Sequence, residues 1–293
     1  MQDTNATKWD GKSRGGSFGY LFFVKALRFF GVRFAYFVLL FVAFYFIFFA
    51  PKATAVSWDY HRKRLGYGRL KSAIRIYWHF YTFAQTIVDK LALRIGMVDE
   101  FSFEYTNSAR FLELIDGGKG VVMIGAHVGC WEVGAQFFGK YGTNMNIVML
   151  DEEHKKIKEV LDKNTIEQNY KIIPIRQDIL ETMVMIREAL SNAEIVCFTG
   201  DRFLKDAPTE TVTFLGGKVR FTNGPFRIAA KCRVPVVFYY AMKESGQKYH
   251  FYFEEASDCK DSQKILSQYI ESLEGIVKKY PEQWFNFYQY WED

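Results

Sequence analysis

Cysteine is scarce in this chain, and its spacing argues against two kinds of site. The 293 residues include four cysteines, none of them in the Cys-x-x-Cys pairs that bind zinc or exchange disulfides. This pattern indicates reduced core thiols in a protein that faces the cytosol. The five histidines also lack metal-ligand spacing. The sequence therefore predicts no metal site and no cofactor.

Other signatures are missing as well. A Gly-x-Ser-x-Gly motif does not occur, which disfavours a serine esterase. No internal repeat or low-complexity linker is present, apart from the polar residues 1 to 16. The net charge of +5 is mild for a nucleic-acid-binding protein, so we expect no nucleic-acid partner. It suits an anionic lipid surface or an acidic carrier protein, although a solvated basic surface explains it equally well.

Aromatic residues, by contrast, are abundant. They make up 18% of the chain and are concentrated in its first third and in its last ten residues. Such an excess is typical of surfaces that contact lipid headgroups. The closing aromatics from Trp284 to Trp291 are too dense for a solvent-exposed tail, so they either cap the core or rest on a bilayer.

The first third contains a candidate membrane segment. Residues Phe34 to Ala50 carry no charge and, as a helix, would reach about 25 Å, slightly less than a hydrocarbon core of about 30 Å. The preceding stretch, Tyr20 to Arg33, is apolar apart from three basic residues and could lie in the headgroup plane. A secretory signal is disfavoured because the run begins late and no small-residue cleavage site follows it. We therefore expect residues 17–51 to form a membrane anchor.

The mode of attachment stays open at this stage. Basic residues flank the apolar run on both sides, which weakens the usual loop-charge argument for orientation. Spanning, monotopic insertion and a protein-buried helix are all compatible with the sequence. Residues 52–100 form an amphipathic helical region, in which Leu70 to Leu93 favours core packing over membrane contact.

Beyond residue 100, short apolar runs alternate with helical patterns. This alternation predicts an α/β domain over residues 101–293, with a mostly parallel sheet flanked by helices and function at the carboxyl ends of its strands. The expected strands are 101–105, 120–124, 146–150, 171–174, 194–199, 234–241 and 249–253. The expected helices are 108–115, 130–141, 152–168, 178–191, 224–232 and 261–280.

The sequence Gly125-Ala-His-Val-Gly-Cys-Trp-Glu132 follows the second of these strands. Two residues five positions apart cannot share one face of a helix, so His127 must lie in the turn before a helix that carries Glu132 in its first turn. Glu132 could then accept a hydrogen bond from one imidazole nitrogen while the other takes a proton. A base with an orienting acid is what acyl transfer to a hydroxyl or amine requires.

This His-x4-Glu pattern, with Trp131 before the acid and Gly134 after it, resembles the first signature of the lysophospholipid acyltransferase superfamily. The Glu version is similar to its late lipid A acyltransferase branch. Further similarities run in the same order along most of the chain: residues 9–16, Gly200-Asp-Arg202, Phe214-Leu-Gly216, Thr222-Asn-Gly-Pro225 and Pro281-Glu-Gln-Trp284. Where lipid A enzymes commonly have two acids, this chain has Asp201-Arg202-Phe203, so its acceptor could differ.

The resemblance implies a glycerolipid acyltransferase-like fold and a membrane-bound enzyme of the bacterial inner membrane, with its catalytic domain on the cytoplasmic side. It implies His127 as general base with Glu132, helix-start amides near residues 129–131 as oxyanion donors, and an acyl carrier protein or coenzyme A thioester as donor. The substrate-binding candidates are Arg176, Asp201, Arg202, Gly216 and Thr222. A carrier protein could contact Lys155, Lys156 and Lys158.

Two other functions remain as alternatives. One is a lipid-binding or assembly protein that has the fold without turnover. The other is a lipid esterase or thioesterase, for which Cys130 would be the nucleophile although neither His127 nor Glu132 obviously activates it. The acceptor also stays open among lipid A, an aminolipid, a pigment ester and a glycolipid, as does the length of the acyl chain.

Overall fold

The computed structural model describes residues 16–138, 144–150, 170–175, 179–203 and 207–292. The amino-terminal helices are α1 (Gly16–Phe49), α2 (Pro51–Asp59) and α3 (Arg69–Arg94), with a π-helical turn, η1 (Tyr60–Arg64), before α3. The remaining helices are η2 (Val98–Glu100), α4 (Ser108–Asp116), α5 (Trp131–Phe138), α7 (Ile179–Ser191), α8 (Gly224–Cys232), α9 (Ser262–Lys279) and η4 (Pro281–Gln283).

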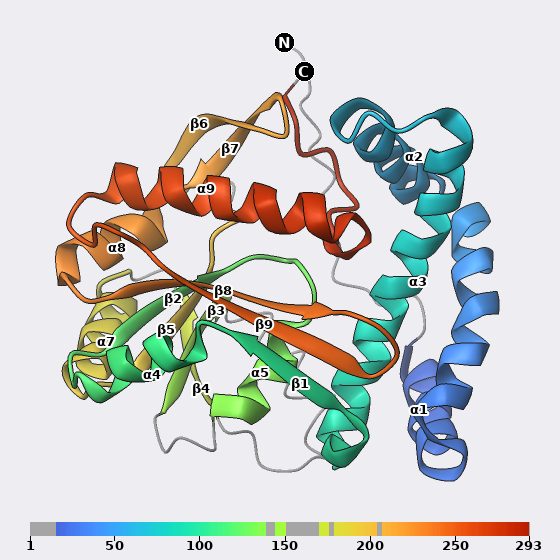
Figure 1. Cartoon of the computed structure of the whole chain (residues 1–293), viewed down its shortest axis with the longest axis horizontal. Coiled ribbons are helices and arrows are strands. Elements are labelled where there is room, and N and C mark those ends of the chain that lie inside the picture. Colours follow the sequence, from blue (N-terminus) through green and yellow to red (C-terminus); the bar gives the residue numbers. More distant parts are fainter. Residues whose placement is uncertain (1–15, 139–143, 151–169, 176–178, 204–206, 293) are drawn as a thin grey trace.

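All seven expected strands lie in one sheet. They are β1 (Ser102–Thr106), β2 (Val121–Gly125), β3 (Met145–Leu150), β4 (Tyr170–Ile175), β5 (Ile195–Thr199), β8 (Val236–Lys243) and β9 (Lys248–Glu255). Their order is β1-β9-β8-β2-β5-β3-β4. Within this sheet every described pairing is parallel except that of β8 with β9. The predicted fold class, a mostly parallel sheet flanked by helices, is confirmed (Figure 1).

Each face of the sheet has its own core. Val122 and Ile124 of β2 belong to a buried cluster that includes residues of α7, α8 and α9. Val121 and Met123 belong to a second cluster with residues of α1, α3, α4 and α5. Because successive side chains of a strand point to opposite faces, a strand covered on both faces has a continuous apolar sequence. This explains the unbroken apolar run of β2.

One part of the fold departs from the expected pattern. Residues 209–222, where no strand was expected, form a β-hairpin in which Leu215 and Gly216 are the two-residue turn between β6 (Thr209–Phe214) and β7 (Gly217–Thr222). Leu215 and Gly216 both have positive φ angles, of 48° and 73°, as a type I′ turn requires. The expected helix 152–168 lies outside the described residues.

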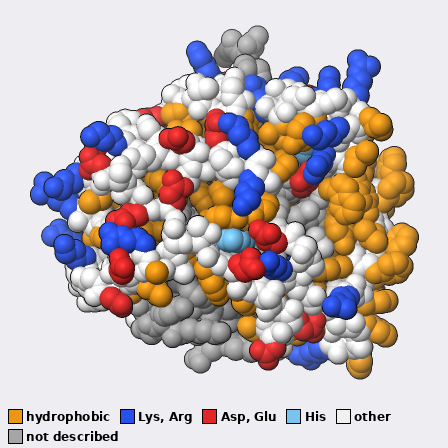
Figure 2. Space-filling view, viewed as in Figure 1, with side chains coloured by type: hydrophobic (Ala, Val, Ile, Leu, Met, Phe, Trp, Pro, Cys, Tyr) orange, Lys and Arg blue, Asp and Glu red, His pale blue; other side chains and the backbone are white. Residues whose placement is uncertain are grey.

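Helix α1 is long, apolar and only partly buried. Its residues Leu21–Phe49 form a helix long and apolar enough to cross a membrane by length and composition. Gly31 breaks its course, with φ 76° and ψ 177°, near the expected change from the amphipathic to the uncharged segment. One side packs on α3 and shares the core beneath the sheet. The other exposes a row of large side chains, Phe29, Phe30, Phe34, Phe37, Phe41, Phe44, Tyr45, Phe48 and Phe49, and Figure 2 shows this side as a broad hydrophobic area at the right.

A buried ion pair joins α1 and α3 to the sheet. The Lys243 ammonium lies 2.7 Å from Oδ2 of Asp89, and the two side chains are 5% and 0% exposed. The hydroxyls of Tyr36 in α1 and Tyr249 in β9 each donate to the same carboxylate at 2.5 Å. Burial raises the pKa of Asp89 and lowers that of Lys243, against their mutual attraction. The cluster therefore depends on both partners being present.

Candidate functional site

His127 and Asp201 meet where two neighbouring parallel strands end. β2 ends at Gly125 and β5 ends at Thr199, so each side chain stands two residues beyond its strand. Nδ1 of the imidazole lies 2.8 Å from Oδ1 of Asp201, and the backbone N–H of His127 donates to Oδ2 at 2.9 Å. One carboxylate thus fixes both the ring and the backbone of the histidine.

The two groups differ in exposure, which sets their chemistry. The Asp201 side chain is 2% exposed and that of His127 is 27% exposed. Burial alone would raise the pKa of Asp201, but its charge interaction and hydrogen bonds with His127, together with the charge of Arg202, hold that pKa below its ordinary value. Because an ionised carboxylate only accepts hydrogen bonds, Nδ1 carries the proton and the Nε2 lone pair of the neutral ring is available.

Glu132 lies in the first turn of α5, as expected, but the structure does not pair it with His127. Its carboxylate lies 2.7 Å from the ammonium of Lys90 in α3, so the expected hydrogen bond between Glu132 and the imidazole is wrong in this structure. The acid at the histidine is Asp201, which the sequence had suggested only as a substrate-binding residue. Lys90 was not predicted at all, because nothing local to the His-x4-Glu motif identifies a residue in α3.

The carboxyl-terminal segment closes around this pair. The Phe285 N–H donates to the His127 carbonyl at 3.0 Å, and Trp284 forms a β-bridge with Val128. The Tyr290 hydroxyl donates to the Asp201 carbonyl at 2.9 Å. Trp284 and Tyr290 are buried, at 1% and 8% exposure. Of the two expectations for the closing aromatics, these residues follow the first, capping the core.

The turn between His127 and α5 is tightly packed. Gly129 has a φ of 57°, and a Cβ at this position would lie 2.0 Å from the Ala241 carbonyl oxygen, so only glycine fits. Its N–H donates to the Gln283 carbonyl, and the Cys130 N–H donates to that of Ala241, both at 2.8 Å. The expectation that these two amides serve as oxyanion donors is therefore wrong. Of the expected amides, only that of Trp131 is left.

The other predicted substrate-binding residues are dispersed. Arg202 donates from Nη2 to the Phe285 carbonyl at 3.1 Å, so it is next to the His127 site. Gly216 lies in the hairpin turn of β6 and β7, and the Thr222 hydroxyl accepts from the N–H of residue 224 at 3.4 Å. These two positions have structural contacts and none with His127 in the described part of the chain. Arg176, Lys155, Lys156 and Lys158 lie outside the described residues.

Metal ligands and the Cys130 thiol are the two remaining features that would indicate another kind of chemistry. Among the described residues, no group of three or more His, Cys, Asp or Glu side chains could hold a metal ion. Cys130 is 1% exposed, and burial raises the pKa of its thiol above the ordinary value. A buried thiol that stays protonated is a poor nucleophile, which argues against the thioesterase alternative.

A family model described as "Bacterial lipid A biosynthesis acyltransferase" matches residues 78–293. Among solved structures, the chain is similar to the 1-acyl-sn-glycerophosphate acyltransferase PlsC from Thermotoga maritima, at 13% identity and a TM-score of 0.40, over 87% of this chain and 100% of that one. No curated protein sequence matches.

Proposed function

Because the chain belongs to the bacterial lipid A biosynthesis acyltransferase family, it is an enzyme that transfers an acyl group to a lipid, and we propose that His127 is the general base of this transfer. The observation that carries the proposal is the hydrogen bond of 2.8 Å between Nδ1 of His127 and the buried Asp201 carboxylate. The bond directs Nδ1 at the carboxylate, so Nε2 is the nitrogen left to meet a substrate, on a side chain that is 27% exposed. The position beyond the carboxyl ends of parallel strands is where α/β folds place their chemistry.

The proposed reaction needs no covalent enzyme intermediate. Nε2 of His127 removes the proton from a hydroxyl or amine of a membrane lipid, and the resulting nucleophile attacks the carbonyl carbon of an acyl thioester. The tetrahedral intermediate then expels the thiolate, which takes the proton back from the imidazolium. The donor is a thioester of acyl carrier protein or of coenzyme A. General-base catalysis of this kind contributes about 10² to 10⁴ in rate.

In this scheme Asp201 is a positioning residue. It holds the proton on Nδ1 and stabilises the imidazolium that forms during the reaction, as the acid of a hydrolase triad does. Glu132, whose catalytic role the family resemblance implies, is assigned instead to the start of α5, where its ion pair with Lys90 ties the histidine turn to α3. The Trp131 amide is the remaining helix-start candidate for the oxyanion.

Two isosteric substitutions separate these roles. Asp201→Asn is expected to lower kcat by about 10²-fold or more, because the amide can present an N–H to Nδ1 and so favour the wrong tautomer. Glu132→Gln keeps the shape of the side chain and weakens its contacts with Lys90 and with the Cys130 thiol, so a loss of about tenfold or less is expected. Steady-state kinetics with a purified acyl thioester and a lipid extract measures both. A larger loss in Glu132→Gln than in Asp201→Asn would reverse the assignment.

We also propose that the exposed side of α1 attaches the enzyme to the bacterial inner membrane, with the catalytic domain on the cytoplasmic side. Support comes from the two sides of this helix: one shares a core with the sheet, and the other exposes aromatic rings such as Phe41 and Phe48, at 65% and 63%. A helix that packs on protein along one side favours monotopic insertion over spanning. Large apolar patches of this kind mark membrane or protein contacts.

Polar substitution of this surface tests the attachment. The quadruple variant Phe37→Gln, Phe41→Gln, Phe44→Gln and Phe48→Gln is expected to lose at least tenfold in partitioning to vesicles, because each buried ring contributes about 1.5 to 3 kcal/mol. Co-sedimentation with vesicles of mixed zwitterionic and anionic phospholipids measures this. The matched control is the double variant Ile179→Gln and Val184→Gln in α7, where the two side chains are 66% and 64% exposed. This variant should bind vesicles like wild type. Equal loss in both variants would contradict the assignment to α1.

The acceptor lipid is identified by a separate experiment. Lipid mass spectra of cells with and without the protein should differ by the mass of one acyl chain on one lipid class, and that shift names the acceptor and the chain together. Lipid A, an aminolipid, a pigment ester and a glycolipid give distinct masses. The absence of any acyl difference would count against acyl transfer in those cells.

A further inference from the structure

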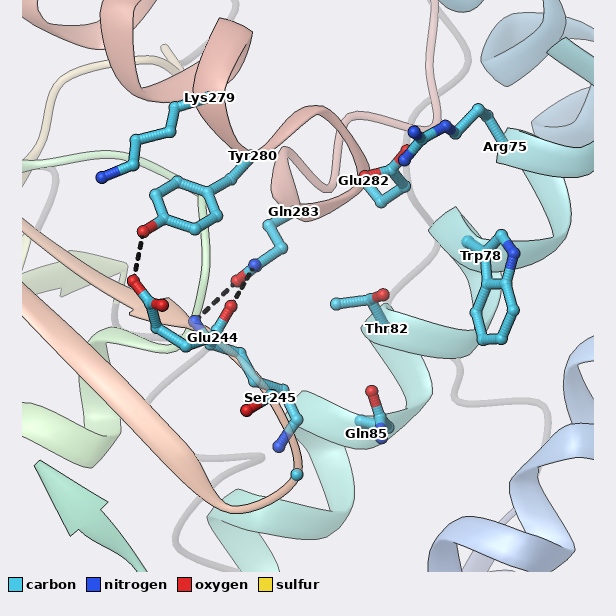
Figure 3. Close-up of a pocket in the computed structure, with 12 residues that line it drawn as sticks. Arg75, Trp78, Thr82, Gln85, Glu244, Ser245, Lys279, Tyr280, Glu282 and Gln283 are labelled. Atoms are coloured by element: carbon cyan, nitrogen blue, oxygen red, sulfur yellow. Dashed lines mark hydrogen bonds and ion pairs between the residues drawn. The ribbon is translucent and has the colours of Figure 1, made fainter. Parts of the chain in front are cut away.

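A pocket lies away from the His127 site. It has a volume of about 340 Å³ and is enclosed by α3, the turn between β8 and β9, the end of α9 and η4. Neither His127 nor Asp201 lines it. Figure 3 shows that Thr82 and Gln85 extend from α3 on one side, opposite Glu244 and Ser245 of the turn, with Lys279 and Tyr280 above. Its size is at the lower end of the range for small-ligand sites.

Gln85 is the feature that points to a ligand. The residue is 9% exposed, and its side-chain amide forms no hydrogen bond with any described residue. Its amide atoms are not sealed in the core but open to the pocket that the residue lines, so a polar group of a ligand can take the place of the water that solvates them. The nearby Gln283, by comparison, is fully used: its side chain accepts from the Lys243 N–H at 2.8 Å and donates to the Lys243 carbonyl at 2.6 Å. Gln85 therefore presents a donor and an acceptor to the pocket.

The rim of the pocket carries charges of both signs. Arg75 is 38% exposed and lies 2.5 Å from Glu282. Glu244, 33% exposed, accepts from the Tyr280 hydroxyl at 2.6 Å, and the ammonium of Lys279 lies over the ring of Tyr280. Two cations and two carboxylates at one opening match a zwitterion better than a ligand of single charge.

The pocket also adjoins the helix that we assign to the membrane. Trp78, which lines it, is 42% exposed. Its ring contacts those of Tyr77 and Tyr81, whose hydroxyls donate to backbone carbonyls of α1. A half-exposed tryptophan between an apolar surface and a charged pocket is typical of the headgroup level of a bilayer.

We propose that this pocket binds the headgroup of a zwitterionic phospholipid that carries a phosphate and a primary ammonium, the chemistry of phosphatidylethanolamine. Arg75 faces the phosphate, Glu244 faces the ammonium, and the Gln85 amide donates to a phosphate oxygen. The acyl chains run toward the exposed side of α1. The inference rests on the membrane attachment proposed above and is independent of the role of His127.

Native mass spectrometry of the full chain in detergent tests the proposal. The protein is mixed with equal amounts of phosphatidylethanolamine, phosphatidylcholine and phosphatidylglycerol with identical chains. Wild type is expected to retain phosphatidylethanolamine about tenfold over phosphatidylcholine, because only a primary ammonium donates hydrogen bonds to a carboxylate. Glu244→Gln is expected to reduce that preference to threefold or less, whereas Gln85→Leu, which removes a contact with the phosphate, should weaken retention of both zwitterionic lipids alike. Equal retention of the three lipids by wild type would overturn the proposal.

A matched control and a competitor complete the test. Arg75→Gln should weaken retention of both zwitterionic lipids. Arg110→Gln, in α4, breaks ion pairs with Glu113 and with Glu255 of β9 and should change neither. Glycerophosphoethanolamine in excess should displace the lipid and inorganic phosphate should not; the reverse pattern would overturn a headgroup site. His127→Ala should keep the preference, so a failure of the acyl-transfer proposal and a failure of this one give different results.

Discussion

His127→Ala is expected to lower the rate of acyl transfer by about 10² to 10⁴-fold, which is the usual contribution of a general base. Alanine removes the only group of this pair that can take the proton of the acceptor, since Asp201 is 2% exposed and directed at Nδ1. The measurement is the transfer of acyl chains from a thioester to a lipid extract by the purified variant. Lipid mass spectra of cells that carry only this variant provide a second reading.

The matched control is His250→Ala. This imidazole stacks on Tyr252 and lies near Glu104 and Glu244, so it is another partly exposed histidine beside carboxylates. Its replacement should leave transfer within about twofold of wild type. If cells with His127→Ala at normal abundance still acylate their lipids at the wild-type rate, the base is misassigned, and a lipid-binding protein without turnover becomes the better interpretation.

Asp89→Ala is expected to cost about 3 to 5 kcal/mol of the free energy of unfolding, because it leaves the Lys243 ammonium buried without its counter-ion. Two tyrosine hydroxyls also lose their acceptor. Denaturant unfolding followed by circular dichroism measures the loss. The double variant Asp89→Leu with Lys243→Met should recover most of it, since removing both charges removes the desolvation cost as well.

An exposed ion pair provides the comparison. Lys63 and Asp59 lie 3.0 Å apart with side chains 64% and 45% exposed, and Asp59→Ala should cost less than about 1 kcal/mol. A loss of similar size in Asp59→Ala and Asp89→Ala would show that burial does not set the strength of the inner pair. The apolar core that α1 shares with the sheet would then be what holds the helix there.

The seven strands of the main sheet and most of its helices follow from periodicity, because each buried strand is a short apolar run between helical patterns. The order of the strands in the sheet, by contrast, could not be predicted from periodicity. Nothing in the residues of β9 indicates that it runs antiparallel to β8 and parallel to β1, because pairing depends on contacts between distant segments. The hairpin of β6 and β7 was missed for a local reason. Its turn begins with Leu215, and leucine gives none of the usual signal for a positive φ.

In the candidate site too, local positions could be predicted from the sequence and long-range partners could not. The position of His127 beyond a strand end, and of Glu132 in the first turn of α5, follows from the glycines and from helical geometry. The partners of both residues do not. Asp201 and Lys90 reach the motif from a neighbouring strand and from α3, and no spacing within the motif encodes either contact. Sequence proximity suggested the nearer acid, whereas the sheet brings in the more distant one.

The pairing of β1 has a consequence for how the chain acquires its fold. In the described sheet β1 is an edge strand whose neighbour is β9, with Ser102 opposite Lys248. Closing so long a loop is slow, because its entropy must be lost before the contacts form. Until then β9 offers an unprotected edge to other copies of the chain. Aggregation during refolding should therefore grow steeply with protein concentration, and a peptide with the sequence of β1 should relieve it by pairing with the free edge of β9.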